Sequence, residues 1–341
     1  MSPQYDRYNK DVNIGQLATA CFDNVDMEGH LLTQETQQRE LKRLEDNTIA
    51  RVSADERVPA AELEKWRTSL RHALHIALAL KNAPKERPRR WNAGKPEEQL
   101  LQREQYYDPR IEAVMVFSGP GTWFEPAIAN DPDWGRWMDR DRIRLGRSLA
   151  YEVAAVRKSR ADGKQVTSGQ LQKEDFQEHA PLFFYNGVPD ENAAFREAMR
   201  HDLLKIPAGK IVIADEFIDP QTGGSTEIVH TGHQVRSLFQ EIENPESPLH
   251  GIRNVALVAS ALDLRIPFYI KQEMLMFGID DDALQFWFYG LPPRRGSRTL
   301  DGREDTTPYQ FEYELPRIVG YGHLGNFPNE PCRFENVDID A

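Results

Sequence analysis

Apolar positions near the start of the chain recur three and four residues apart, the spacing of one face of a helix. The pattern runs from about residue 12 to residue 82, through LLTQETQQRELKRLEDNTIARV and PAAELEKWRTSLRHALHIALAL. Val58 and Pro59 mark a boundary between two helices, because the residue before a proline avoids the helical conformation. The segment from Asn82 to Glu98 is rich in proline and charge, which indicates a linker or exposed loop.

From Arg110 onward, short apolar runs alternate with helical stretches. The runs have the composition of buried strands: IEAVMVFSG, PLFFYNG, KIVIADEF and RNVALVAS. The stretches between them are long enough to be the helical crossovers that parallel strands require. The pattern therefore predicts an α/β fold with a Rossmann-like, doubly wound, mostly parallel sheet.

Both ends of the chain add to this core. We predict an N-terminal helical segment and linker over residues 1–98, the Rossmann-like core over 99–270, and an aromatic-rich C-terminal extension over 271–341 that packs on the core. Two interpretations stay open for the aromatic side chains of the extension, among them Trp287, Tyr289 and Tyr321. They form either a lid that excludes water from a pocket or ordinary core packing.

Charge and cysteine content narrow the class of protein. The 341-residue chain carries a formal net charge of -12, which argues against a protein that mainly binds nucleic acid. Cys21 and Cys332 form no metal or disulfide motif, and no apolar run has the length of a signal peptide or membrane span. We therefore expect a soluble, cytoplasmic protein with a small-molecule ligand, no membrane partner, and a homodimer as its candidate assembly.

Polar residues follow each expected strand. Because the carboxyl ends of parallel strands share one edge of a sheet, these residues define a candidate pocket. Glycine and serine allow close approach of a ligand, and an acidic tip suits a ribose diol or an amino group. The competing interpretation is that they form turns and helix caps. The tips are Ser118 with Gly119 and Gly121, Asn186 with Gly187, Asp215 with Glu216, and Ser260 with Asp263 and Arg265.

Charged and titratable groups lie in two further places. His230 and His233 stand three apart where a helix should point its amino end at the same edge, so one of them could act as a general acid or base. Two histidines without a further ligand do not make a closed metal site, and we predict none. An arginine from the row 140–147 after the first strand could face the pocket and bind a carboxylate or phosphate.

The order of these motifs resembles the SanA/ElyC/YdcF-like family, a domain of unknown function. The resemblance extends from about Arg110 to Phe327 and is greatest to the cytoplasmic YdcF-type members. It rests on the segments AVMVFSGPG, LFFYNGVPDENAAFREAM, IPAGKIVIADE, TGHQVRSLFQEI and NVALVASALDLRIPF, and on the tail YELPRIVGYGHLGNF.

The resemblance implies further site residues and a cofactor. It adds Glu197, Gly232, Gln234 and Arg236 to the strand tips, and it implies binding of S-adenosylmethionine on a Rossmann-like fold. Where the family usually has Glu-Asn at the start of the third helix, this chain has His233-Gln234. The resemblance therefore implies a shared pocket rather than shared chemistry.

The leading hypothesis is a small-molecule-binding protein, and an S-adenosylmethionine-dependent transferase if it is an enzyme. His233, Asp215, Glu216 and Arg265 are the candidate catalytic residues, and the other tip residues would hold the ligand. A non-catalytic metabolite sensor or scaffold is the first alternative. A metal-assisted hydrolase centred on His230 and His233 is the second.

Overall fold

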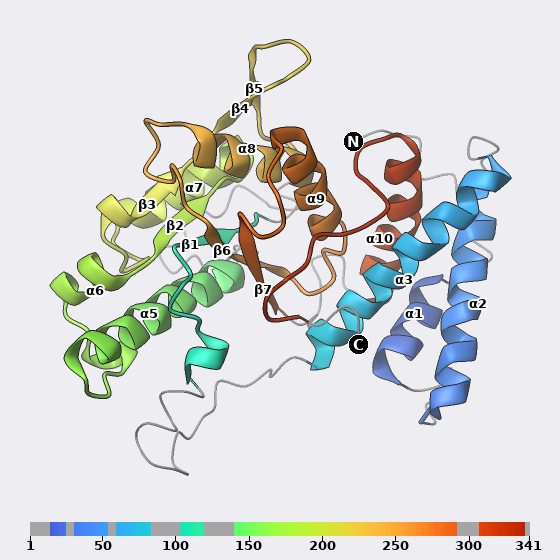
Figure 1. The fold of residues 1–341 in the computed structure, drawn as a ribbon, viewed down its shortest axis with the longest axis horizontal. Helices are drawn as coiled ribbons and strands as arrows, with labels where there is room; N and C mark the ends of the chain where they lie inside the picture. Colours follow the sequence, from blue (N-terminus) through green and yellow to red (C-terminus); the bar gives the residue numbers. More distant parts are fainter. Residues whose placement is uncertain are drawn as a thin grey trace.

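The computed structural model of the chain describes residues 14–24, 31–53, 59–82, 103–118, 140–291 and 307–337 (Figure 1). Gly119 and Gly121, which we expected at the tip of the first strand, lie outside the described residues, as does most of the expected linker.

A parallel sheet forms the centre of the fold. Within the described residues, its five strands lie in the order β3-β2-β1-β6-β7, and every neighbouring pair is parallel. Val114 of β1 is in register with Phe183 of β2 on one side and Ala256 of β6 on the other. The strands are β1 (Ala113–Val116), β2 (Leu182–Tyr185), β3 (Ile211–Ile213), β6 (Asn254–Ser260) and β7 (Gln285–Leu291).

Helices cover both faces of this sheet. Val114 and Val116 of β1 pack with α5 (Arg140–Asp162), α6 (Lys173–His179) and α7 (Pro189–Arg200). Ala113 and Met115 point to the opposite face, which is covered by α8 (Thr231–Glu243) and α9 (Ile266–Phe277). Burial on both sides explains why the strands are continuous apolar runs in the sequence instead of alternating ones. The expected α/β class and largely parallel sheet are confirmed.

β7 is a strand that the sequence analysis did not predict. Its residues, QFWFYGL, belong to the aromatic run that we assigned to the C-terminal extension. Phe286 and Phe288 pack on one face of the sheet and Trp287 and Tyr289 on the other, so β7 is a continuous apolar run like the other strands. The predicted boundary at residue 270 falls inside α9.

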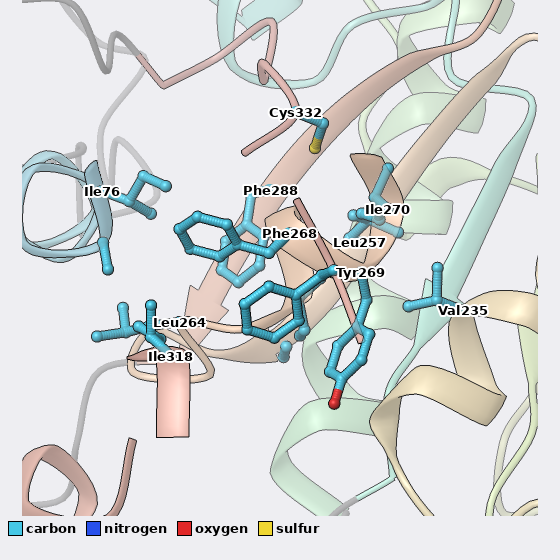
Figure 2. Packing of buried hydrophobic residues seen from close by; sticks show 14 of the residues in the cluster. Ile76, Val235, Leu257, Leu264, Phe268, Tyr269, Ile270, Phe288, Ile318 and Cys332 are labelled. Atoms are coloured by element: carbon cyan, nitrogen blue, oxygen red, sulfur yellow. The ribbon is translucent and has the colours of Figure 1, made fainter. Parts of the chain in front are cut away.

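The expected N-terminal helices are present. They are α1 (Ile14–Asp23), α2 (Gln34–Ser53) and α3 (Ala60–Asn82), and they pack against the C-terminal helix α10 (Thr307–His323). Figure 1 shows α10 between α9 and these helices. One apolar cluster extends from Ile76 of α3 and Ile318 of α10 to Leu257 and Phe288 of the sheet (Figure 2).

A small hairpin lies between β3 and α8. Its strands, β4 (Glu216–Ile218) and β5 (Ser225–Glu227), pair antiparallel and extend beyond the body of the sheet in Figure 1. The sequence predicts a single strand over KIVIADEF, whereas β3 ends at Ile213 and β4 begins at Glu216. The turn-forming residues DPQTGG after β4 are the signal that was missed.

A glycine allows β7 to lie close to the end of β6. A Cβ atom on Gly290 would lie 2.9 Å from both Cα and Cβ of Ala261. We therefore expect Gly290→Ala to lower the free energy of unfolding by about 1–3 kcal/mol through overpacking. Urea unfolding measures the change, with Gly169→Ala as the control because a Cβ there meets nothing within 4 Å. Equal stability of the two variants would contradict this account of the β6–β7 packing.

Candidate functional site

The expected polar tips lie along one edge of the sheet. Ser118 follows β1, Asn186 follows β2, Asp215 follows β3, and Ser260 is the last residue of β6. Parallel pairing places these carboxyl ends together, as predicted from the sequence. The arrangement defines a candidate ligand-binding edge, which we call the strand-tip edge.

Gln234, in the first turn of α8, joins two of these tips. Its side-chain amide Nε2 donates to Ser118 Oγ at 2.6 Å and to the carbonyl oxygen of Asn186 at 3.0 Å. In return, Asn186 Nδ2 donates to the backbone oxygen of Gln234 at 2.7 Å. These contacts hold the amino end of α8 against the ends of β1 and β2.

Asn186 is fully buried, and its Oδ1 atom finds no hydrogen-bond partner in the described structure. An unsatisfied buried acceptor costs about 1–3 kcal/mol. Asn186 is therefore held by the hydrogen bond of its Nδ2 atom to Gln234, while its Oδ1 atom is left without a partner among the described residues.

A second polar group joins the tips of β2 and β3. Asn192 Oδ1 accepts the Gly187 N–H at 2.7 Å, and its Nδ2 donates to the Ala214 carbonyl at 3.0 Å and to Asp215 Oδ1 at 2.9 Å. Arg196 forms an ion pair with Asp215, with Nη1 at 2.8 Å from Oδ1, and lowers the pKa of this carboxyl group. Asp215 is therefore an ionised, paired group, which makes it a poor general acid.

Arg142, which belongs to the arginine row, reaches the strand-tip edge. From the first turn of α5, its Nη1 donates to the Phe117 carbonyl at 3.2 Å, and its Nη2 lies 3.4 Å from Asp263 Oδ2. The same Asp263 oxygen accepts the Ser260 N–H at 2.9 Å. One guanidinium thus spans the ends of β1 and β6.

His230 and His233 lie at the start of α8, as expected. His230 Nδ1 accepts the backbone N–H groups of Gly232 and His233, at 3.1 and 3.3 Å, and so acts as the N-cap of the helix. The two rings are in contact, with centroids 3.5 Å apart. His233 also packs on Phe217 of the hairpin.

Both histidines are neutral at neutral pH. Burial of the ring, His233 and the charges of Arg265 and Arg236 lower the pKa of His230 to about 3, although the residue as a whole is exposed. Burial also lowers the pKa of His233. The capping role of Nδ1 implies the tautomer with hydrogen on Nε2.

Three predicted site residues turn away from the network around Ser118 and Gln234. Glu216 lies on the hairpin and accepts a hydrogen bond from the Ser225 hydroxyl. Arg236 pairs with Glu273 of α9, with Nη2 at 2.7 Å from Oε1. Arg265 pairs with Glu314 of α10 through two hydrogen bonds of 2.9 and 2.8 Å. Both arginines tie helices together.

Gly232 and the aromatic residues predicted for the C-terminal extension contribute to packing. A Cβ on Gly232 would lie 2.9 Å from Tyr269 Cε1, so this glycine serves the contact between α8 and α9. Trp287 and Tyr289 are buried in the sheet, which confirms core packing over a lid for these two aromatics. Tyr321 lies against Arg265, with 5.4 Å between the guanidinium carbon and the ring centroid.

Glu191 and Asn192 are two residues of the edge that the sequence pattern did not indicate. Both lie in the first turn of α7 and are buried, with Glu191 5% exposed. Glu191 Oε2 accepts the Val188 N–H at 3.3 Å, so this glutamate caps the helix. The proline and acidic residues at the start of PDENAAF predicted only a helix start, which explains why no role at the edge was assigned. Glu197, implied by the resemblance, pairs instead with Arg200 and His201.

No group of three or more His, Cys, Asp or Glu side chains in the described ranges is placed to hold a metal ion. Among the helices described, none has the length and apolar character needed to cross a membrane.

Comparison with protein-family models, curated proteins and solved structures finds no match for this chain.

The neutral His230 cap predicts a pH-dependent stability. The unfolded chain binds a proton near pH 6.5, whereas the folded pKa is depressed, so stability is complete above pH 6.5 and falls as the pH drops below it. His230→Asn keeps a capping side chain without a titrating ring. We expect urea unfolding of this variant between pH 7 and pH 4 to show a smaller loss of stability than the parent protein.

His230→Ala is the matched variant for the cap. It also removes the titrating ring, but it lowers stability at pH 7 by about 0.5–2 kcal/mol because the cap is lost. A pH dependence unchanged in both variants would show that His230 is not the group that titrates.

Proposed function

We propose that this protein binds a nucleoside-type small molecule at the strand-tip edge of a Rossmann-like domain. S-adenosylmethionine is the ligand implied by the family resemblance and the first to test. The observation that carries the proposal is the strand order, which reverses between β1 and β6. Open parallel sheets bind ligands in the crevice beyond the carboxyl ends of the strands at such a reversal.

The side chains at this reversal suit a polar ligand. Ser118 Oγ accepts a hydrogen from Gln234, so its own O–H is able to donate. Arg142 spans the ends of β1 and β6 and offers a positive charge with several N–H groups. Hydroxyl, amide and guanidinium groups at one edge match the hydroxyls and charged end of a nucleoside derivative.

Transferase activity is the enzymatic form of this proposal. The strand-tip edge would then hold S-adenosylmethionine and position an acceptor beside it. The ligand would contact side chains that are already held in place, because each is hydrogen-bonded to a neighbouring element. These side chains are Gln234, Ser118 and Asn186.

A metabolite sensor or scaffold is the second candidate, favoured by a specific observation. Asp215, Arg236 and Arg265 are all engaged in ion pairs, and the histidines of α8 have lowered pKa values. Such groups are weak general acids and bases at neutral pH. The packing of α1, α2 and α3 on α10 supplies a helical surface for assembly in this case.

Calorimetric titration with S-adenosylmethionine, S-adenosylhomocysteine and ATP tests the binding proposal. We expect S-adenosylmethionine to bind, and Ser118→Ala to weaken binding by about threefold to tenfold through loss of one hydrogen bond. Ser225→Ala, on the hairpin, is the matched control and should leave the affinity unchanged. Absence of binding by all three ligands would overturn the assignment of a nucleoside-type ligand.

A further inference from the structure

The β4–β5 hairpin extends beyond the body of the sheet next to α8 (Figure 1). Its inner side chains anchor it, because Phe217 and Ile228 are buried and the Phe217 ring packs on His233. The side-chain amide of Gln240 also holds it, through hydrogen bonds of 2.7 Å to both the N–H and the carbonyl oxygen of Ile218. The hairpin is therefore fixed to the core although it protrudes.

The opposite side of the hairpin carries two acidic and two apolar side chains. Alternate residues of a strand share a face, so Glu216 and Ile218 of β4 lie on the same side as Glu227 of β5 and Val229, two positions after it. All four residues are exposed, Ile218 by 50% and Val229 by 57%. We call these four residues the outer face. It presents apolar surface and negative charge to solvent.

The two glutamates of the outer face stand directly opposite each other. Glu216 is in register with Glu227, and in such a pair the Cβ atoms are about 4.5–5.5 Å apart. Like charges in this position destabilise a sheet. Neither carboxylate forms an ion pair with any residue that the structure describes, and Glu216 accepts only the Ser225 hydroxyl. The hairpin therefore keeps two adjacent negative charges without a cation to neutralise them in the described part of the fold.

The free edge of β5 is open beside this face. The Asp219 N–H donates to the Gly224 carbonyl across the hairpin, so the alternation of an antiparallel ladder turns the N–H and C=O groups of Ser225 away from β4. Neither group has a hydrogen-bond partner among the described residues. The edge is closed farther along, where the Val229 N–H donates to His233 Nδ1 at 3.4 Å. An unpaired donor and acceptor at a strand edge can pair with the backbone of another chain.

We propose that the outer face and the open edge of β5 dock an extended, basic segment of a partner protein. An antiparallel strand added beside β5 pairs with Ser225 and places alternate side chains on the outer face. Lysine or arginine beside Glu227 neutralises the acidic pair, and an apolar side chain two positions along covers Val229. The formal net charge of -12 favours a basic partner over a second copy, which would bring its own glutamates to this face. The inference does not depend on a ligand at the strand-tip edge.

The test titrates a fluorescein-labelled, end-blocked peptide, Thr-Lys-Thr-Val-Thr-Lys-Thr, with the whole chain by fluorescence anisotropy at low salt. In an extended conformation its lysines and valine share one face. A second peptide has glutamate in place of lysine. A third is N-methylated at the lysines and the valine, so it keeps the charge but cannot donate from the edge that would face Ser225. We expect the first peptide to bind about tenfold or more tightly than either of the others.

Variants of the outer face separate docking from folding. Glu216→Gln and Glu227→Gln should each weaken binding of the basic peptide by about twofold to fivefold through loss of an exposed ion pair. Val229→Thr keeps the branched shape but removes apolar contact, and should also weaken binding. Glu246→Gln changes an exposed acid outside the hairpin and is the matched control. Both hairpin glutamine variants should unfold thermally no lower than the parent protein, because they relieve the like-charge pair.

Three results would overturn the docking site. The first is failure of the basic peptide to bind, or binding that the Glu216→Gln and Glu227→Gln changes together leave unaltered. The second is equal binding of the N-methylated peptide, which would exclude an added strand. The third comes from sedimentation equilibrium: a dimer that Val229→Thr dissociates would show that a second copy of the chain covers the outer face instead.

Discussion

The structure depends on β1 being paired on both sides and covered on both faces. Its four residues, all buried, pair with β2 and β6 and carry side chains that point alternately toward α5 and toward α8 and α9. A parallel strand in this position has no surface open to water, so every residue must be apolar and each crossover must return over a face of the sheet. The helical crossovers between β1, β2, β3 and β6 meet this requirement.

The same requirement gathers the polar residues at the edge. Apolar strands can carry polar groups only where they end, and parallel pairing brings those ends together. Ser118, Asn186 and Asp215 occupy three of them, and Gln234 and Asn192 connect them by hydrogen bonds to backbone and side chains. Gln234 places an amide at the buried start of α8, where an apolar residue could stand instead. Its hydrogen bonds keep this edge both rigid and polar, as a binding surface requires.

Two largely buried ion pairs hold helices of the fold together. Arg236–Glu273 and Arg265–Glu314 join α8 to α9 and the start of α9 to α10 across largely buried contacts. Burial raises the pKa of Glu314, while Arg265 acts to lower it. Removing either partner of such a pair would leave a buried charge without compensation, so these groups are committed to the fold.

The outer edge of β7 is not paired with another strand of the sheet among the described residues. Glu335 and the side chain of Asn336 hydrogen-bond to the backbone of β7 there and so cover this edge.

Local patterns in the sequence predicted the N-terminal helices, the crossover helices between the strands, four of the sheet strands and the polar tips that end them, but not the helices α9 and α10. These features follow from periodicity and turn chemistry within a few residues. The tertiary structure alone decided that QFWFYGL is a strand, because its pairing with β6 is what places these aromatic residues in the sheet. It also decided the partners of the charged groups: Arg236 and Arg265 pair with residues 37 and 49 positions away, and Arg142 meets Asp263 across the sheet edge. No local pattern records such pairs, since they exist only when distant elements pack together.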